Sequence, residues 1–120
     1  DRVIIAMPMH NFTVTSRLKD YLDNIIVPGQ TFQYTREGPQ GLMGGHKALL
    51  VQSSGSVYST GPLAPWEQSY PFLRTAFGML GFDSTDIVRA EGTMDPNIGP
   101  DLAVERACAE LEQKLPEFLA

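Results

Sequence analysis

Three short segments hold most of the polar and aromatic side chains that could bind a ligand. They are "PMHNF" (residues 8–12), "SSGSVYSTGP" (53–62) and "EGTMDPNIGP" (91–100). In the first, Pro8 and Phe12 are expected to shape a turn, while the amide of Asn11 supplies hydrogen-bond donors and an acceptor. We therefore predict that "PMHNF" forms one wall of a site for a flat ligand.

Other kinds of site have weaker support. His10 and His46 do not lie at ligand spacing with a partner, so a metal site is disfavoured, although His10 is either a turn residue or part of the ligand site. "SSGS" lacks the Gly-x-Ser-x-Gly pattern of a serine nucleophile and fits a turn or an anion-binding nest. Asp95 and Glu91 lie next to Pro and Gly, where acids are usually solvated or cap a helix. We assign no catalytic acid, base or nucleophile.

Each of the three segments follows a predicted strand. "RVIIAM" and "KALLVQ" are continuous apolar runs, typical of strands covered on both faces, and "DIVRAEG" is predicted to be a third strand. A predicted helix follows each strand, and this alternation favours parallel strands with right-handed crossovers, the doubly wound α/β arrangement. Ligands of such sheets bind beyond the carboxyl ends of the strands, so the three segments should meet there.

Helical periodicity places the three helices. They are predicted to run from Thr15 or Ser16 as the N-cap to Pro28, from about Tyr70 to a C-terminal cap at Gly81, and onward from Pro100. Their predicted buried faces are Leu18, Tyr21, Leu22, Ile25 and Ile26, then Leu73, Ala76, Phe77 and Leu80, and finally Val104, Ala107, Cys108, Leu111 and Leu115. Residues 31–46 are too long for a simple connector and are predicted to form a functional loop or a small hairpin.

Composition favours one globular domain. The chain has 120 residues, of which 42% are hydrophobic and 19% are charged. Its net charge of −5, without a basic cluster, disfavours nucleic acid as a partner. The single cysteine, Cys108, excludes a disulfide framework and fits a reducing compartment. Because no apolar run reaches membrane-spanning length and no targeting motif appears, we expect a cytoplasmic protein.

Taken in order, the motifs resemble one known family. "PMHNF", a helix with "LKDYLD", then "TFQYTREGPQGL", "KALLVQSSG" and "AEG" are similar to the FMN-dependent NADH-azoreductases, relatives of the flavodoxin-like NAD(P)H:quinone oxidoreductases. The resemblance implies a flavodoxin-like fold and a homodimer with FMN near the subunit interface. It also implies hydride transfer from NADH or NADPH through the flavin to quinones or azo compounds. The alternative is a non-catalytic electron carrier or interaction module, against which the lid-like "TFQYTREGPQGL" argues.

The resemblance assigns roles to individual positions. Substrate contacts fall to Tyr58 and to Phe32, which is expected to be an exposed aromatic that covers the pocket of the neighbouring subunit. The sequence departs from the family at Ser54-Gly55-Ser56, where Arg-Gly-Gly is common, and Tyr58 and His10 stand where His and Tyr are common. The cofactor-binding positions are Pro8, Met9, His10, Asn11, Phe12, Ser53, Ser54, Gly55 and Ser56.

The resemblance also implies that residues 1–120 form a single but partial domain. They match the third, fourth and fifth strands of a 2-1-3-4-5 sheet, without the first two β-α units and their serine-rich phosphate loop, and the chain begins on Asp1 without an initiator Met. The first strand should then have an unpaired apolar edge. We expect this chain alone to bind FMN poorly and to be inactive, which isothermal titration with FMN can test.

Overall fold

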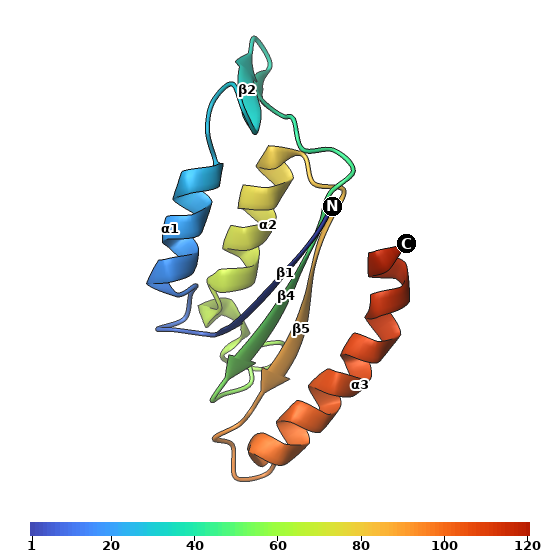
Figure 1. The fold of residues 1–120 in the computed structure, drawn as a ribbon. Helices are drawn as coiled ribbons and strands as arrows, with labels where there is room; N and C mark the ends of the chain where they lie inside the picture. The colour runs from blue at the N-terminus through green and yellow to red at the C-terminus, as the bar shows by residue number, and fades with distance from the viewer.

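The computed structural model describes residues 1–120 and has the predicted α/β architecture (Figure 1). Its parallel sheet contains β1 (Arg2–Pro8), β4 (Lys47–Ser54) and β5 (Ser84–Glu91) in the order β1-β4-β5. Helices α1 (Ser16–Ile25) and α2 (Ser69–Leu80) cover one face of this sheet, and α3 (Gly99–Leu119) covers the other (Figure 1). All three strands therefore have their carboxyl ends at the same edge, as the sequence predicted.

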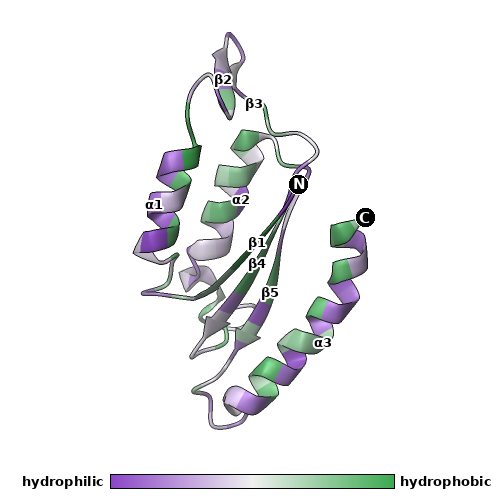
Figure 2. Cartoon of the chain, in the orientation of Figure 1, coloured by the Kyte–Doolittle hydropathy of each residue, from purple (hydrophilic) through white to green (hydrophobic).

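Consecutive strand residues point into two separate apolar layers. Leu50 packs with the residues of α1 and α2, whereas Leu49 packs with Ala107 and Phe118 of α3. This alternation explains why β4 reads as an unbroken apolar run, because both of its faces are covered. Helices α1 and α3 carry apolar and polar residues side by side, as amphipathic helices do (Figure 2).

The helix ends follow the predicted chemistry closely. The side chain of Thr15 caps α1 by accepting a hydrogen bond of 3.3 Å from the backbone N–H of Leu18. Gly81 ends α2 with a φ of +90°, a left-handed conformation that glycine adopts without steric cost. The predicted end of α1 at Pro28 lies too far along the chain, because the helix ends at Ile25.

Three residues predicted to be buried on helix faces are exposed instead. Tyr21 is 45% exposed, Val104 is 52% exposed and Cys108 is also exposed. The buried stripe of α3 runs through Ala103, Ala107 and Phe118, with Leu111 and Leu115 partly buried. One helical residue corresponds to a rotation of about 100°. The prediction was therefore right for Ala107, Leu111 and Leu115, but it extended the stripe by one residue to Val104 and Cys108, which lie on the exposed face.

Residues 31–46 contain a small hairpin, one of the two predicted possibilities. Strand β2 (Phe32–Thr35) pairs antiparallel with β3 (Gly38–Gly41), and the hairpin projects away from the sheet (Figure 1). Its base lies against the C-terminal end of α2, where the N–H of Met43 donates to Leu80 O at 2.9 Å. None of the helices combines the length and the apolar content that a membrane span requires.

Replacing Gly41 by alanine is expected to lower the free energy of unfolding by about 1–3 kcal/mol, because the added methyl would overpack the hairpin base. A Cβ on Gly41 would collide with the backbone of Leu80 and Gly81, which cannot rotate away as a side chain can. Gly44 is the matched control, since a Cβ there meets no atom within 4 Å. Chemical denaturation measures both variants, and equal costs would contradict the close packing at Gly41.

Candidate cofactor-binding site

The loop after β1 makes a tight turn with unusual backbone angles. His10 and Thr13 exchange two backbone hydrogen bonds, from His10 N–H at 3.0 Å and from Thr13 N–H at 3.2 Å. Between them, Asn11 and Phe12 have φ values of +49° and +72°. Asparagine tolerates this region, but a bulky residue such as phenylalanine rarely occupies it, at a cost on the order of 1–3 kcal/mol. Such strain is typical of binding sites.

Contacts from other segments hold Phe12 in this conformation. Its carbonyl oxygen accepts a 2.7 Å hydrogen bond from the N–H of Gln68, at the start of α2. Its ring makes edge-to-face contacts with Tyr58, at 6.5 Å between centroids, and with Trp66, at 5.5 Å. Trp66 ends the short 3-10 helix η1 (Ala64–Trp66) and is 54% exposed. The first loop is thus fixed between the second loop and the η1–α2 junction.

In the second loop, after β4, the backbone carbonyls point toward the segment that follows β5. Ser54 O accepts from the N–H of Thr93 at 3.2 Å, and Gly55 O accepts from the N–H of Met94 at 3.0 Å. Ser56 O accepts from the Ser54 hydroxyl at 2.8 Å, so this serine side chain closes the loop internally. The departure from Arg-Gly-Gly therefore places a loop-stabilising hydroxyl where the family often has a cation.

Several backbone N–H groups of the two loops, in contrast to these carbonyl groups, have no hydrogen-bond partner. Those of Asn11, Phe12, Gly55 and Ser56 donate no hydrogen bond within the chain. Neighbouring backbone N–H groups without partners form a site of positive potential that suits an anionic or carbonyl-bearing ligand edge. The two loops therefore offer donors, while the carbonyls of Phe12, Ser54, Gly55 and Ser56 are used by the protein itself.

The structure brings the two predicted loops together around one pocket. It has a volume of about 220 Å³ and is lined by Met9, Asn11, Phe12, Ser54, Gly55 and Tyr58. Four other predicted cofactor positions lie beside this lining. Pro8 and Ser53 are register partners at the ends of β1 and β4, His10 begins the turn, and Ser56 continues the second loop.

Phe32 does not have the exposure that the sequence predicted. It is 4% exposed and belongs to the apolar core between the sheet, α1 and α2. The exposed aromatic of the hairpin is Tyr34, whose ring packs edge-to-face on Phe32 at 5.2 Å. The glycine-rich composition of this segment suggested an open loop, but pairing of β2 with β3 turns Phe32 inward.

The structural role of Glu91 was not predicted from the sequence. Its carboxylate accepts hydrogen bonds from the N–H groups of Tyr58 at 2.8 Å and Ser59 at 2.9 Å. Asp95, the other acid considered, accepts from the N–H of Asn97 at 2.8 Å, which is the solvated turn role expected for it. For the role of Glu91, the only sequence signal was a glutamate at the end of a predicted buried strand.

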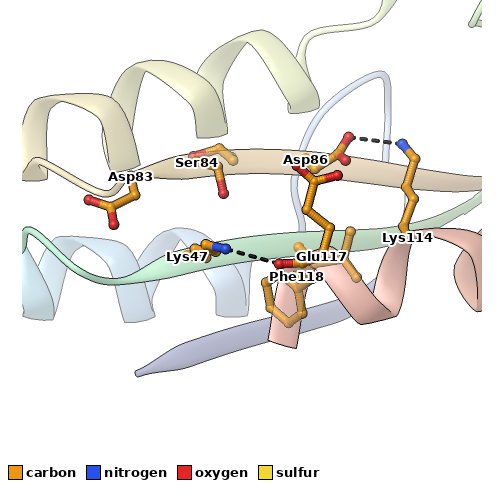
Figure 3. Close-up of a pocket in the computed structure, with 9 residues that line it drawn as sticks. Lys47, Asp83, Ser84, Asp86, Lys114, Glu117 and Phe118 are labelled. Atoms are coloured by element: carbon orange, nitrogen blue, oxygen red, sulfur yellow. Dashed lines mark hydrogen bonds and ion pairs between the residues drawn. The ribbon is translucent and has the colours of Figure 1, made fainter. Parts of the chain in front are cut away.

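A second cavity, of about 290 Å³, lies at the amino ends of β4 and β5 (Figure 3). Most of the charged groups facing it already have partners, and the carboxylate of Glu117 is the exception. Lys114 Nζ lies 2.9 Å from Asp86 Oδ1 and 3.1 Å from Glu110 Oε1, and Lys47 Nζ donates to Glu117 O at 2.9 Å. This cavity therefore offers little to a ligand. No group of three or more His, Cys, Asp or Glu residues is placed to hold a metal ion.

Alkaline pH is expected to destabilise this region. Partial burial raises the pKa of Tyr70 above its ordinary 10.0; Asp86 also raises it, whereas Arg74, Lys114 and Arg89 lower it. Partial burial alone would lower the pKa of Lys114, but hydrogen bonds to Asp86 and Glu110 outweigh that effect and raise it above 10.5. Both groups keep their protons longer in the folded state, so their contribution is complete below pH 10 and disappears as the pH rises through the folded pKa values. Melting temperatures measured from neutral to strongly alkaline pH should fall, and Tyr70→Phe should lessen the fall.

Comparison with known proteins places this site in a family. The sequence model of a family described as having a flavodoxin-like fold matches residues 1–115. The fold is similar, with a TM-score of 0.88 and 36% sequence identity, to that of the FMN-dependent NADH-azoreductase from Bacillus anthracis solved in complex with FMN, covering 97% of this chain and 55% of that one. The chain thus belongs to the flavodoxin-like family.

Curated relatives point to one branch of that family. The chain is 45% identical over 121 residues to FMN-dependent NADH:quinone oxidoreductase 1 of Bacillus subtilis strain 168, covering 98% of this chain and 57% of that protein. It is 39% identical over 117 residues to an FMN-dependent NADH:quinone oxidoreductase of Sinorhizobium fredii, covering 98% and 55%. The chain therefore spans little more than half the length of the relatives it matches.

Proposed function

We propose that this chain is part of an FMN-dependent oxidoreductase that passes a hydride from NADH or NADPH through the flavin to quinones or azo compounds. This proposal rests on one observation: beside a single pocket, four backbone N–H groups have no partner, those of Asn11, Phe12, Gly55 and Ser56. The names of the relatives, which are FMN-dependent NADH:quinone oxidoreductases and NADH-azoreductases, support the same assignment.

The residues present fit the ring system of FMN. A flavin ring presents nitrogen and carbonyl oxygen atoms along one edge, and these need donors of the kind that the two loops leave free. The proposed cofactor contacts are Met9, Asn11, Phe12, Ser54 and Gly55, which line the pocket. Pro8, His10, Ser53 and Ser56 are proposed to support them from adjacent positions.

The protein's own part in this reaction is to position and stabilise. Bound FMN would supply the hydride chemistry, so no acid, base or nucleophile is required of this chain. The free N–H groups of Gly55 and Ser56 would stabilise negative charge on a reduced ring, because their dipoles are already oriented. Phe12 and Tyr58 would exclude water from one side of the pocket. For Phe32, its burial favours an indirect role in substrate binding through the hairpin that carries it.

Steady-state kinetics on the natural protein that carries this chain test the proposed reaction. NADH and the quinone would react in turn with one cofactor, so initial-rate plots at varied concentrations of both should give parallel lines. Intersecting lines would contradict this sequence of events.

Replacing Asn11 by glycine is expected to weaken FMN binding by about 2- to 10-fold, the equivalent of one lost hydrogen bond. Glycine accepts the φ of +49° at this position, so the backbone of the turn and the thermal stability should be preserved. Fluorescence titration with FMN measures the affinity. An unchanged affinity would remove the Asn11 side chain from the proposed site.

We also propose a homodimer in a cytoplasmic location. Large apolar side chains are exposed near the pocket, namely Phe12, Trp66 and Met94, which favours cover by a second subunit. The lone Cys108 fits a reducing compartment. Sedimentation of the natural protein tests the first proposal, and a monomer at micromolar concentration would contradict it.

A further inference from the structure

Strand β5 ends in a carboxylate that faces backbone N–H groups instead of a cation. One oxygen of Glu91 accepts from Tyr58 N–H at 2.8 Å and from Ser59 N–H at 2.9 Å. The other oxygen accepts from the Ser59 hydroxyl. No lysine, arginine or histidine forms an ion pair with Glu91. Its hydrogen bonds are charge-assisted and therefore stronger than those between neutral groups.

These contacts are the main attachment of the segment that carries Tyr58. Residues 57–60 donate no backbone hydrogen bond except the two that Glu91 accepts. Tyr58 lines the candidate pocket, and its ring lies 6.5 Å from that of Phe12. The separation of these two rings therefore depends on where Glu91 holds the Tyr58 backbone.

We propose that Glu91 is a positioning residue of the candidate site: it fixes Tyr58 against Phe12 and so sets the shape of the aromatic wall that a planar aromatic acceptor would contact. The proposal deepens the proposed function and rests on it. It gives Glu91 no proton to transfer, because both oxygens are occupied as acceptors.

Two replacements separate geometry from charge. Glu91→Gln keeps an oxygen for both N–H groups, and its amide nitrogen can donate to the Ser59 hydroxyl, so the attachment is retained. Glu91→Ala removes it. The matched control is Asp95→Asn, which alters an acid of the same loop that contacts only its own turn. If Glu91→Ala does not fold, Glu91→Asp replaces it, because the shorter side chain withdraws the carboxylate.

The first readout uses flavin-free protein. Amide hydrogen exchange at Tyr58 and Ser59 should be at least about tenfold faster in Glu91→Ala than in the parent, since the amides lose their acceptors. Protection should persist in Glu91→Gln and in Asp95→Asn. Equal exchange in the parent and in Glu91→Ala would overturn the proposal, whatever cofactor the protein binds.

The second readout uses the natural protein with its cofactor. In Glu91→Ala, the KM for the quinone should rise at least about fivefold, the scale of one lost hydrogen bond, while the FMN content stays within about twofold. Glu91→Gln should restore the KM. Parallel loss of FMN and activity would make Glu91 a merely structural residue. Absence of flavin from the parent would instead refute the proposed function.

A separate set of contacts covers the free edge of β5. This strand is the last in the order β1-β4-β5, so its outward backbone groups face no strand. Thr85 O accepts from the Tyr70 hydroxyl at 2.9 Å, and Ile87 O accepts from Lys114 Nζ at 2.9 Å. The N–H of Ile87 donates to Asp86 Oδ1 at 2.7 Å. Tyr70 comes from α2 and Lys114 from α3, on opposite faces of the sheet, and Lys114 is seen beside Asp86 in Figure 3.

We infer that these side chains prevent β5 from pairing with the same strand of a second copy. Alternate residues of a strand direct their N–H and C=O groups to the same side, so Thr85 and Ile87 expose one continuous stretch of edge. An open stretch of this kind is a template for another strand. Here three of its groups are already hydrogen-bonded to side chains, and charges flank them.

The double variant Tyr70→Phe with Lys114→Met tests this inference, with Lys19→Met as the control because Lys19 pairs with Asp23 on the exposed face of α1. Sedimentation across a concentration series should show self-association beyond that of the parent only in the double variant. Unchanged sedimentation of a folded double variant would overturn the inference. If the double variant does not fold, hydrogen exchange at the Ile87 amide provides the test. Exchange should be slow in the parent and at least about tenfold faster in Asp86→Ala. Fast exchange in the parent would show that the free edge of β5 is not covered by these side chains.

Discussion

Replacing Glu67 by alanine is expected to lower the free energy of unfolding by about 3–5 kcal/mol, because it leaves the charge of Arg89 largely buried without a partner. Glu67 is only 6% exposed, and Arg89 Nη2 lies 2.9 and 3.2 Å from its two carboxylate oxygens. Glu67 also accepts from the N–H of Tyr70 at 3.3 Å, so the first turn of α2 loses an acceptor as well.

The double variant Glu67→Met with Arg89→Met is the control for this explanation. It removes both charges and keeps apolar volume at both positions, so it should be markedly more stable than Glu67→Ala. Urea denaturation of the flavin-free protein gives all the values. A double variant less stable than Glu67→Ala, or a single variant within about 1 kcal/mol of the parent, would contradict a charge-based cost.

Replacing Gly92 by alanine should disturb both the fold and the cofactor site. The φ of Gly92 is +81°, and an added Cβ would lie 2.6 Å from Ile98 Cδ1 and 3.3 Å from Val57 Cγ2. We expect a loss of about 1–2 kcal/mol from the left-handed backbone. The steric cost should be smaller, because Ile98 Cδ1 is the end of a side chain that can rotate, and only the 3.3 Å contacts with Ile98 Cβ and Val57 Cγ2 oppose the added methyl. Gly92 N–H also donates to Ser56 O at 3.3 Å, so the second loop should shift and FMN affinity should fall by at least about tenfold, or 1.4 kcal/mol.

Gly99 provides the matched control for Gly92. Its φ is +80°, almost the same, but a Cβ there meets no atom within 4 Å. Gly99→Ala should therefore show only the backbone cost and leave FMN affinity unchanged. Denaturation curves and FMN titrations of the two variants isolate the effect of the contact. Similar FMN affinities in both would show that Gly92 does not support the second loop.

The strands and their order in the sequence were predictable because their signals are local. Each strand is a short apolar run whose neighbours are turn residues, and the strict alternation with helices leaves a parallel sheet as the consistent arrangement. Thr15 and Gly81 acted as helix caps for local reasons too. The stripe of α3, which was predicted too wide, shows the limit, since Ala103 and Val104 differ in helical phase but not in apolar character.

The residues that line the site were predictable, but the backbone groups that remain free to bind a ligand were not. Asn11, Phe12, Ser54 and Gly55 lie at or just beyond the ends of strands that finish at the same edge, so their meeting follows from the fold. The N–H groups of Thr93 and Met94, which are distant in sequence, donate to the carbonyls of the second loop. These carbonyls are therefore occupied, which the local sequence does not reveal. The burial of Phe32 likewise depends on hairpin pairing and on the packing of α2, which composition alone does not encode.

The visible absorption spectrum of the natural protein that carries this chain tests the proposed oxidoreductase most directly. After removal of unbound small molecules, the protein should retain the bands of oxidised flavin. Addition of NADH without oxygen should bleach them, and a quinone should restore them. A protein without flavin bands, or one whose bands NADH leaves unchanged, would contradict the proposed oxidoreductase.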